Sequence, residues 1–122
     1  MNETRIPAPH CLRERVVGRT TVVELYGEID ILTAPVVSAR LDALTCAPYP
    51  QLVVDLRRVT FIDCRGLSAL CRARNRALRC GGRVRLVIGS PRVLRMLRAV
   101  GLTDVFEVLP VLPDVTSPVG PA

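Results

Sequence analysis

The sequence predicts a single α/β domain built on a mostly parallel sheet, with an N-terminal hairpin at one edge and helices packed against the sheet. The first observation is size, because 122 residues, 49% of them hydrophobic, suffice for one core but not for two domains. The second is order, because strand-like and helix-like segments alternate after an initial pair of strands. Right-handed crossovers between parallel strands, with one antiparallel edge, follow from that order.

Two β-branched runs form the predicted hairpin. Residues 1–11, which contain two prolines, are expected to be a flexible lead-in. The strands are predicted over Arg13–Val17 and Thr21–Tyr26, and Gly18 between them can take the positive φ that a tight turn requires. Residues 27–30 close the second strand.

The first helix is expected to begin near Thr33, whose hydroxyl can cap the first turn, while Pro35 fits inside that turn. Residues 46–50 contain two prolines and are predicted to stop the helix and turn the chain. The apolar residues that recur at helical spacing between these signals are Val37, Leu41 and Leu44.

A short central strand is predicted over Gln51–Leu56, because its continuous apolar character favours burial on both faces. We expect it to end near Asp55. A basic connecting segment and the two apolar residues 61–62 are expected to follow before the next helix. A long helix then runs over Cys64–Cys80, with the carboxylate of Asp63 as its N-cap. The residues predicted to form its inward stripe are Leu67, Leu70, Cys71, Ala77 and Leu78.

The last third of the chain continues the alternation of strands and helices. Two glycines at 81–82 end the long helix, and a strand is predicted over Arg83–Ile88. Ser90 and the proline after it are a strong start signal for a helix that runs through Ala99. A last strand is predicted over Asp104–Leu109. The residues that the third helix is expected to bury are Val93, Leu94 and Leu97.

These elements predict a flexible segment over residues 1–11, one domain over 12–109 and a Pro-rich tail over 110–122. No apolar run approaches the ~20 residues of a membrane span, and the first ten residues lack the apolar centre of a signal peptide. We therefore expect a cytoplasmic protein without membrane insertion.

The cysteines and the single histidine argue against metal chemistry. Five cysteines, none spaced as Cys-x-x-Cys, favour reduced thiols over a zinc site or a disulfide framework. Cys64 lies at a helix start, which favours a reactive thiol, but it has neither a phosphate-binding loop nor a base beside it. There is also no glycine-rich nucleotide loop. We expect no metal, no cofactor and no catalytic residue, and hence a protein that is not an enzyme.

The net charge of +6 is unevenly distributed. Residues 57–98 contain twelve arginines and one acid, Asp63. All 17 basic residues are arginine, which coding bias explains better than a need for bidentate anion contacts. One stripe of the long helix contains Arg65, Arg72, Arg76 and Arg79. It is either a solvated face or a strip that attracts an acidic partner. Direct nucleic-acid binding is disfavoured, because aromatic residues that could stack on bases make up only 3%.

Three stretches of the chain carry a family resemblance: VVELYGEIDILTAP, VVDLRRVTFIDCRGLSAL and GGRVRLVIGSPRVLRMLRAVGLTDVFEV. In this order and spacing they resemble the STAS domain of the bacterial anti-sigma factor antagonists, from about Arg13 to Val108. The resemblance implies a cytoplasmic regulatory protein that binds an anti-sigma factor and so frees a sigma factor. The anti-sigma factor in that family is a serine kinase of the histidine-kinase-like ATPase type. A homodimer is left open.

One position departs from the family pattern. In the family the helix begins with Asp-Ser-Ser-Gly, and the kinase phosphorylates the second serine. The same positions here are Asp63, Cys64, Arg65 and Gly66. Arg65 cannot accept a phosphoryl group, and its charge is opposite to that of phosphoserine. We therefore expect the usual phosphorylation of a serine at this position to be missing. Ser68 is a weaker candidate for accepting a phosphoryl group. We expect Arg65 to form an ion pair with a carboxylate of the partner.

The resemblance places partner docking at the start of the long helix and at the neighbouring residues 27–32. The candidate partner-binding residues are Glu28, Asp30, Asp63, Cys64, Arg65, Gly66, Leu67 and Arg72. An alternative from a different class is a STAS subunit of an ABC-type membrane transport complex. There the same fold contacts a permease or an ATPase, and no phosphorylation is needed.

Overall fold

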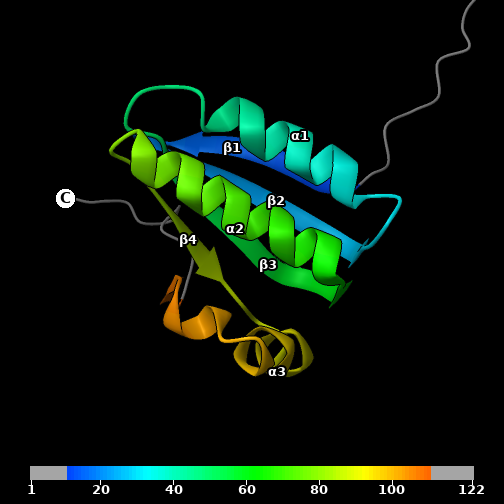
Figure 1. Cartoon of the computed structure of the whole chain (residues 1–122). Helices are drawn as coiled ribbons and strands as arrows, with labels where there is room; N and C mark the ends of the chain where they lie inside the picture. The colour runs from blue at the N-terminus through cyan, green and yellow to red at the C-terminus, as the bar shows by residue number, and fades with distance from the viewer. Residues whose placement is uncertain (1–10, 111–122) are drawn as a thin grey trace, which may run out of the picture.

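The computed structural model describes residues 11–110. Its elements are β1 (Leu12–Val17), β2 (Thr20–Ile29), α1 (Ala34–Leu44), β3 (Gln51–Ile62), α2 (Cys64–Arg79), β4 (Arg83–Val87), α3 (Pro91–Ala99), the 3-10 helix η1 (Leu102–Asp104) and β5 (Glu107–Leu109). The strands form one sheet in the order β1-β2-β3-β4-β5 (Figure 1). The β1–β2 pair is antiparallel and the other pairs are parallel, so the predicted class and hairpin are confirmed.

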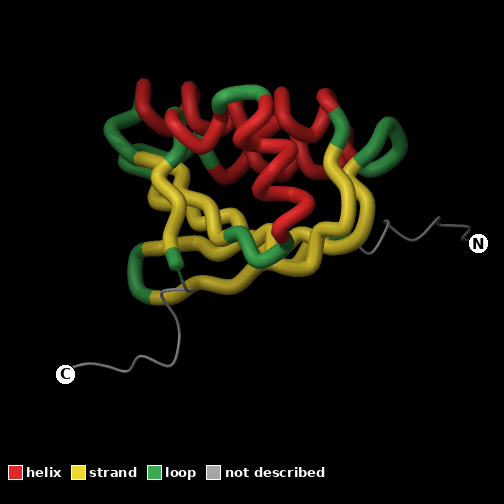
Figure 2. Tube along the Cα trace, turned by 90° about the horizontal axis from the view of Figure 1, so that it is seen from below, coloured by secondary structure: helices red, strands yellow, loops and turns green. Residues whose placement is uncertain are grey.

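The three α-helices of residues 11–110 lie on one face of the sheet (Figure 2). The main core fills the space between these helices and the inward side chains of the strands. On the opposite face, a small buried cluster is formed by Val22, Val53 and Val87. The prediction that the central strand is buried on both faces is confirmed, although no helix of the described residues covers the second face.

The hairpin has the predicted turn, with Gly18 at a φ of 62°. The lead-in predicted over 1–11 and the tail predicted over 110–122 lie outside the described residues, except for Cys11 and Pro110. Cys11 is only 3% exposed, and its carbonyl accepts a hydrogen bond from the Tyr26 N–H at 2.8 Å. Its assignment to a flexible segment is therefore wrong, because β2 holds its backbone and the core holds its side chain.

The prediction of a short central strand is wrong. β3 is 12 residues long and continues to Ile62 instead of ending near Asp55. It can do so because β2 is also long, so that Ile29 at the end of β2 still pairs with Ile62. Asp55 is tolerated inside the strand because Arg57 donates from Nε and Nη2 to its two carboxylate oxygens, each at 3.0 Å.

α1 begins at Ala34, but the predicted cap by the Thr33 hydroxyl is wrong. Thr33 Oγ1 donates instead to the Glu28 carbonyl at 2.8 Å and accepts from the Asp30 N–H at 2.9 Å. The hydroxyl therefore fixes the connection between β2 and α1 and leaves the first turn of the helix to backbone contacts, such as Ala34 N–H to the Asp30 carbonyl at 2.7 Å.

α2 begins and ends close to the predicted residues, but its buried side overlaps the predicted stripe only in part. The buried residues are Gly66, Ala69, Leu70, Ala73 and Ala77. Among the residues of the predicted stripe, Leu70 and Ala77 are buried as predicted, whereas Leu67 and Cys71 are half-buried and Leu78 is 48% exposed. The small residues let α2 pack closely, since interhelical distance depends on the side chains at the contact. A prediction from the larger apolar side chains therefore misplaces the stripe.

The last helix starts as predicted, because Ser90 Oγ accepts from the Val93 N–H at 3.3 Å. Gly101 follows α3 with a φ of 78°. The final strand is shorter than predicted: Leu102–Asp104 form η1, and β5 covers only Glu107–Leu109.

Candidate functional site

The predicted site lies where β2 and β3 end and α1 and α2 begin (Figure 1). The Asp63 N–H donates to the Ile29 carbonyl at 3.0 Å, which joins the ends of the two strands. Asp63 Oδ1 accepts from the N–H groups of Arg65 at 2.9 Å and Gly66 at 3.1 Å. Asp63 is thus the N-cap of α2, an interaction that typically contributes about 1 kcal/mol.

Gly66 allows the first turn of α2 to lie directly against the strand ends. A Cβ at this position would be 2.6 Å from Cγ1 of Ile62 and 2.8 Å from Cγ2 of Ile29. Both isoleucines are fully buried, and Gly66 is buried as well. Gly66 therefore positions the start of the helix and does not itself present a surface.

Asp30 holds the β2–α1 connection in one conformation. Its Oδ1 accepts from the N–H groups of Leu32 at 3.0 Å and Thr33 at 3.2 Å. These backbone hydrogen bonds lower the pKa of the Asp30 carboxyl, because they stabilise its charged form. The ionised carboxylate fixes a loop that projects Ile31 and Leu32 outward.

Two apolar side chains of this loop are exposed, and a third is exposed near the end of β3, on the face of the sheet away from the helices. Ile31 is 58% exposed, Leu32 77% and Phe61 36%. Phe61 pairs with Glu28 in the β2–β3 register, which places it beside the end of β2. Exposed apolar residues that gather at one edge are typical of a protein-binding surface. We define the α2 corner as Asp30–Leu32, Phe61 and Asp63–Arg65.

A groove of about 310 Å³ opens beside the α2 corner, between the starts of α1 and α2. Small side chains such as Ala34, Ser38 and Ser68 form much of its lining, and Arg65 and Arg72 are its charged residues. The groove can therefore receive an apolar side chain with a carboxylate next to it.

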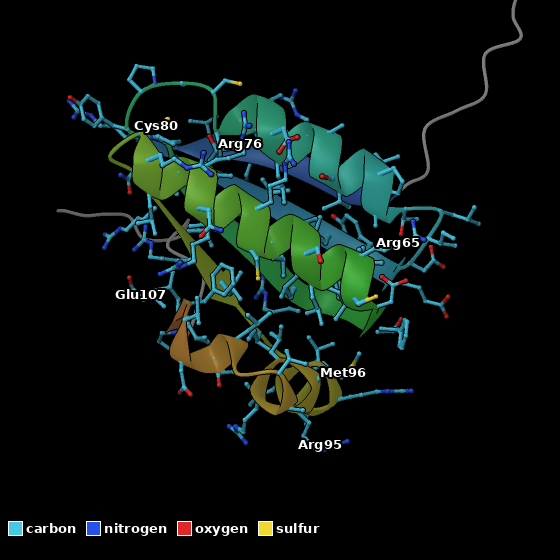
Figure 3. The ribbon with its side chains drawn as sticks, viewed as in Figure 1. Arg65, Arg76, Cys80, Arg95, Met96 and Glu107 are labelled. Carbon is cyan, nitrogen blue, oxygen red and sulfur yellow. The ribbon has the colours of Figure 1, made fainter. Side chains whose placement is uncertain are left out.

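The arginines of the α2 stripe divide into two groups. Arg72 Nε donates to Asp42 Oδ1 on α1 at 2.9 Å. Arg76 lies between α1 and α2 (Figure 3) and its Nε donates to Thr45 Oγ1 at 3.1 Å. The guanidinium groups of Arg65 and Arg79 have no hydrogen bond or ion pair with any residue in 11–110; Arg79 is at the end of α2, and Arg65 lies at its exposed start (Figure 3). Arg72 and Arg76 thus hold α1, whereas Arg65 is available to a partner.

The structure brings some of the predicted site residues together and separates others. Asp30, Asp63, Cys64 and Arg65 share the α2 corner, whereas Arg72 lies two turns further along α2 in the groove. Glu28 is exposed on β2, opposite Phe61. Leu67 is half-buried and faces α3 rather than the corner.

The exposure of Phe61 could not be predicted from the sequence, where Phe61 is treated only as one of two apolar residues in the connection before the long helix. Successive residues of a strand point to opposite faces, so a buried Ile62 requires Phe61 to point the other way. That alternation becomes a usable signal only once residues 61–62 are assigned to the strand.

The chemistry offered by the α2 corner is that of a binding surface: apolar side chains, a capped helix start and one unpaired cation. Within residues 11–110, no group of three His, Cys, Asp or Glu side chains is arranged to hold a metal ion. The five cysteines have free thiols. None of the helices in the described part of the chain is long and apolar enough to cross a membrane.

Comparison with known proteins gives matches over most of the chain. The family model of the STAS domain matches residues 13–116. The anti-sigma-B factor antagonist of Bacillus subtilis is 29% identical over 86 residues, which cover 70% of this chain and 78% of that protein. A crystal structure of an anti-sigma factor antagonist from Mycobacterium paratuberculosis is 29% identical, with a TM-score of 0.75 and coverage of 83% of this chain and 86% of that one.

The same fold occurs inside a larger membrane protein. The structure of the murine Solute Carrier 26 family member A9 anion transporter is 17% identical to this chain and has a TM-score of 0.67. The match covers 80% of this chain and 17% of the transporter. At this identity the likeness concerns the fold alone.

Proposed function

The chain belongs to the STAS-domain family, and on that premise we propose that it is an anti-sigma factor antagonist that docks on its partner through the α2 corner. The observation that carries the proposal is that two relatives, each 29% identical over most of both chains, are named as antagonists of this kind. The partner is an anti-sigma factor of the serine-kinase type, and its capture frees a sigma factor.

The chemistry of the α2 corner supports this docking mode. Leu32 and Ile31 supply apolar area that a partner can cover, and the Asp30 hydrogen bonds fix their loop before binding. A loop that is already ordered loses less entropy on association. The groove beside it accepts one partner side chain, and the unpaired Arg65 accepts a partner carboxylate.

The position of Arg65 supports a partner interaction without the usual serine phosphorylation. A phosphoserine would add about −1.5 to −2 charge at this point. Arginine holds a permanent positive charge there, so kinase activity of the partner leaves this position unchanged. Binding through the α2 corner is then governed by the amount of each protein rather than by a phosphate at residue 65.

Titration calorimetry with an anti-sigma factor from the same genome tests the docking surface. Leu32→Asp puts a charge where the partner covers apolar area and should weaken binding at least about tenfold. Val16→Asp is the matched control, because Val16 is 71% exposed on β1 at the sheet edge away from α2. Equal affinity of the Leu32→Asp variant and the wild type would contradict docking through the α2 corner.

A STAS subunit of a membrane transport complex is the second candidate, and the fold shared with the murine anion transporter favours it. Affinity purification of the tagged chain from its own cells separates the two functions. Recovery of a permease or its ATPase, with no anti-sigma factor, would replace the first proposal by the second.

A further inference from the structure

We propose that a second groove, between α2 and α3, binds an acidic amphipathic helix of a protein partner. This groove measures about 470 Å³, and its apolar lining comes from Leu67 and Cys71 on α2 and from Val100 and Leu102 after α3. It lies on the side of α2 that faces away from α1. Docking through the α2 corner leaves these four side chains unused, so the inference goes beyond the proposed antagonist function.

One wall of the groove is an apolar stripe on α2 that the core covers only in part. Leu67, Cys71 and Leu78 are separated by four and seven residues and therefore share one side of the helix. The first two are half-buried, and Leu78 is 48% exposed. The lining of the groove on α2 extends from Cys64 to Asn75, roughly 16 Å at 1.5 Å per residue, so Leu78 lies beyond it, with Arg74 between Cys71 and Leu78.

The other wall comes from the end of α3 and the residues after it. Val100 is 56% exposed, and Leu102 is half-buried. Met96, one turn before Val100, is also half-buried against the core. Two apolar walls along a helix match helix-in-groove recognition, in which a partner inserts side chains spaced three or four residues apart.

The charges around the groove indicate that a partner helix bound there is acidic. Arg72 lines the groove, although its Nε also donates to Asp42 on α1. Arg74 is three residues after Cys71 and lies on the same side of α2, and no acidic residue is among the lining residues. Arg92 is four residues before Met96 and lies on the same side of α3. Arg95 lies on the side of α3 away from α2 (Figure 3). A second copy of this chain would bring like charges together, so charge complementarity favours an acidic partner over self-association.

The probe for the test is a synthetic amphipathic peptide of ~15 residues, about four helical turns, with leucine on one face and glutamate at the flanking positions. Its control carries lysine instead of glutamate. Fluorescence anisotropy should show that the acidic peptide binds, that the lysine peptide does not, and that added salt weakens binding.

Two variants locate the binding in the groove. Val100→Asp and Asn75→Asp each place a carboxylate at an exposed lining position and should weaken peptide binding about tenfold or more. Val16→Asp on β1 should bind like the wild type. Bound peptide should also slow maleimide labelling of Cys71 and leave the labelling of the exposed Cys46 unchanged.

Several results would overturn the proposal. They are absence of binding by the acidic peptide, equal binding of both peptides, or full affinity of both aspartate variants. A concentration-dependent dimer in sedimentation that Val100→Asp abolishes would show that a second copy of the chain fills the groove, and would also overturn it.

Discussion

Gly66→Ala adds one methyl group beneath the α2 corner, at a point with no room for it. The new Cβ would be 2.6 Å from Ile62 and 2.8 Å from Ile29, whereas carbon atoms in contact are normally about 3.5–4.0 Å apart. Overpacking costs about 1–3 kcal/mol, and the upper part of that range, about 2–3 kcal/mol, applies here because both close contacts are to atoms bonded directly to a buried Cβ. Alanine recovers about 0.8–1 kcal/mol through its helix propensity. We therefore expect a net loss of about 1–2 kcal/mol in the free energy of unfolding.

Urea denaturation followed by circular dichroism measures this loss. For a domain of this size the slope is about 1–3 kcal/mol per molar urea, so the midpoint should fall by roughly 0.3–2 M. Ser68→Ala, at an exposed position of the same helix, should change stability by no more than about 0.5 kcal/mol. An unchanged or higher midpoint for Gly66→Ala would refute the close contact between α2 and the strand ends.

Three further predictions follow from the site. Asp63→Ala should lower the unfolding free energy by about 1 kcal/mol through loss of the N-cap, whereas Asp63→Asn should stay near wild type. The pKa of Asp30 is lowered on folding, so its contribution is fully present above the unfolded value of 3.8 and is lost as pH falls through the folded value. The stability difference between wild type and Asp30→Asn, from urea curves at several pH values, should therefore shrink below about pH 4; a constant difference would contradict the assignment. Burial raises the pKa of the Cys11 thiol, so in a timed thiol-labelling assay it should react only on unfolding, well after Cys46 and Cys64; simultaneous labelling would oppose this.

The parts of the fold that short-range signals determine could be predicted from the sequence. Gly18 ends β1 through its positive φ, and Asp63 and Ser90 cap the helices that follow them. The hydroxyl of Thr33 looks like the same signal, yet it bonds to the Glu28 carbonyl. That choice depends on where β2 ends relative to the loop, which local sequence does not encode.

The errors concern long-range pairing. Arg57 and Arg58 look like a polar link, but β2 is long enough to pair with β3 beyond them, and Arg57 neutralises Asp55. Likewise, Leu78 fits the helical period of α2, but the packing of that helix through small residues leaves it exposed.

The candidate site was predicted in its location but not in its surface. The family resemblance identified Asp63 and Arg65, and the structure adds the separate roles of the arginines: Arg72 binds Asp42, whereas Arg65 has no partner within residues 11–110. The outward direction of Phe61 depends on the extent of β3 and could not be read from composition or spacing.

The affinity for a kinase-type anti-sigma factor, measured before and after incubation with ATP and magnesium, shows whether phosphorylation controls binding of this chain. The wild-type chain should bind equally well in both conditions, because Arg65 accepts no phosphate. The Arg65→Ser variant should acquire a phosphate, detected by mass spectrometry, and lose affinity. Loss of wild-type affinity after ATP, with phosphate on Ser68 or another residue, would contradict the account.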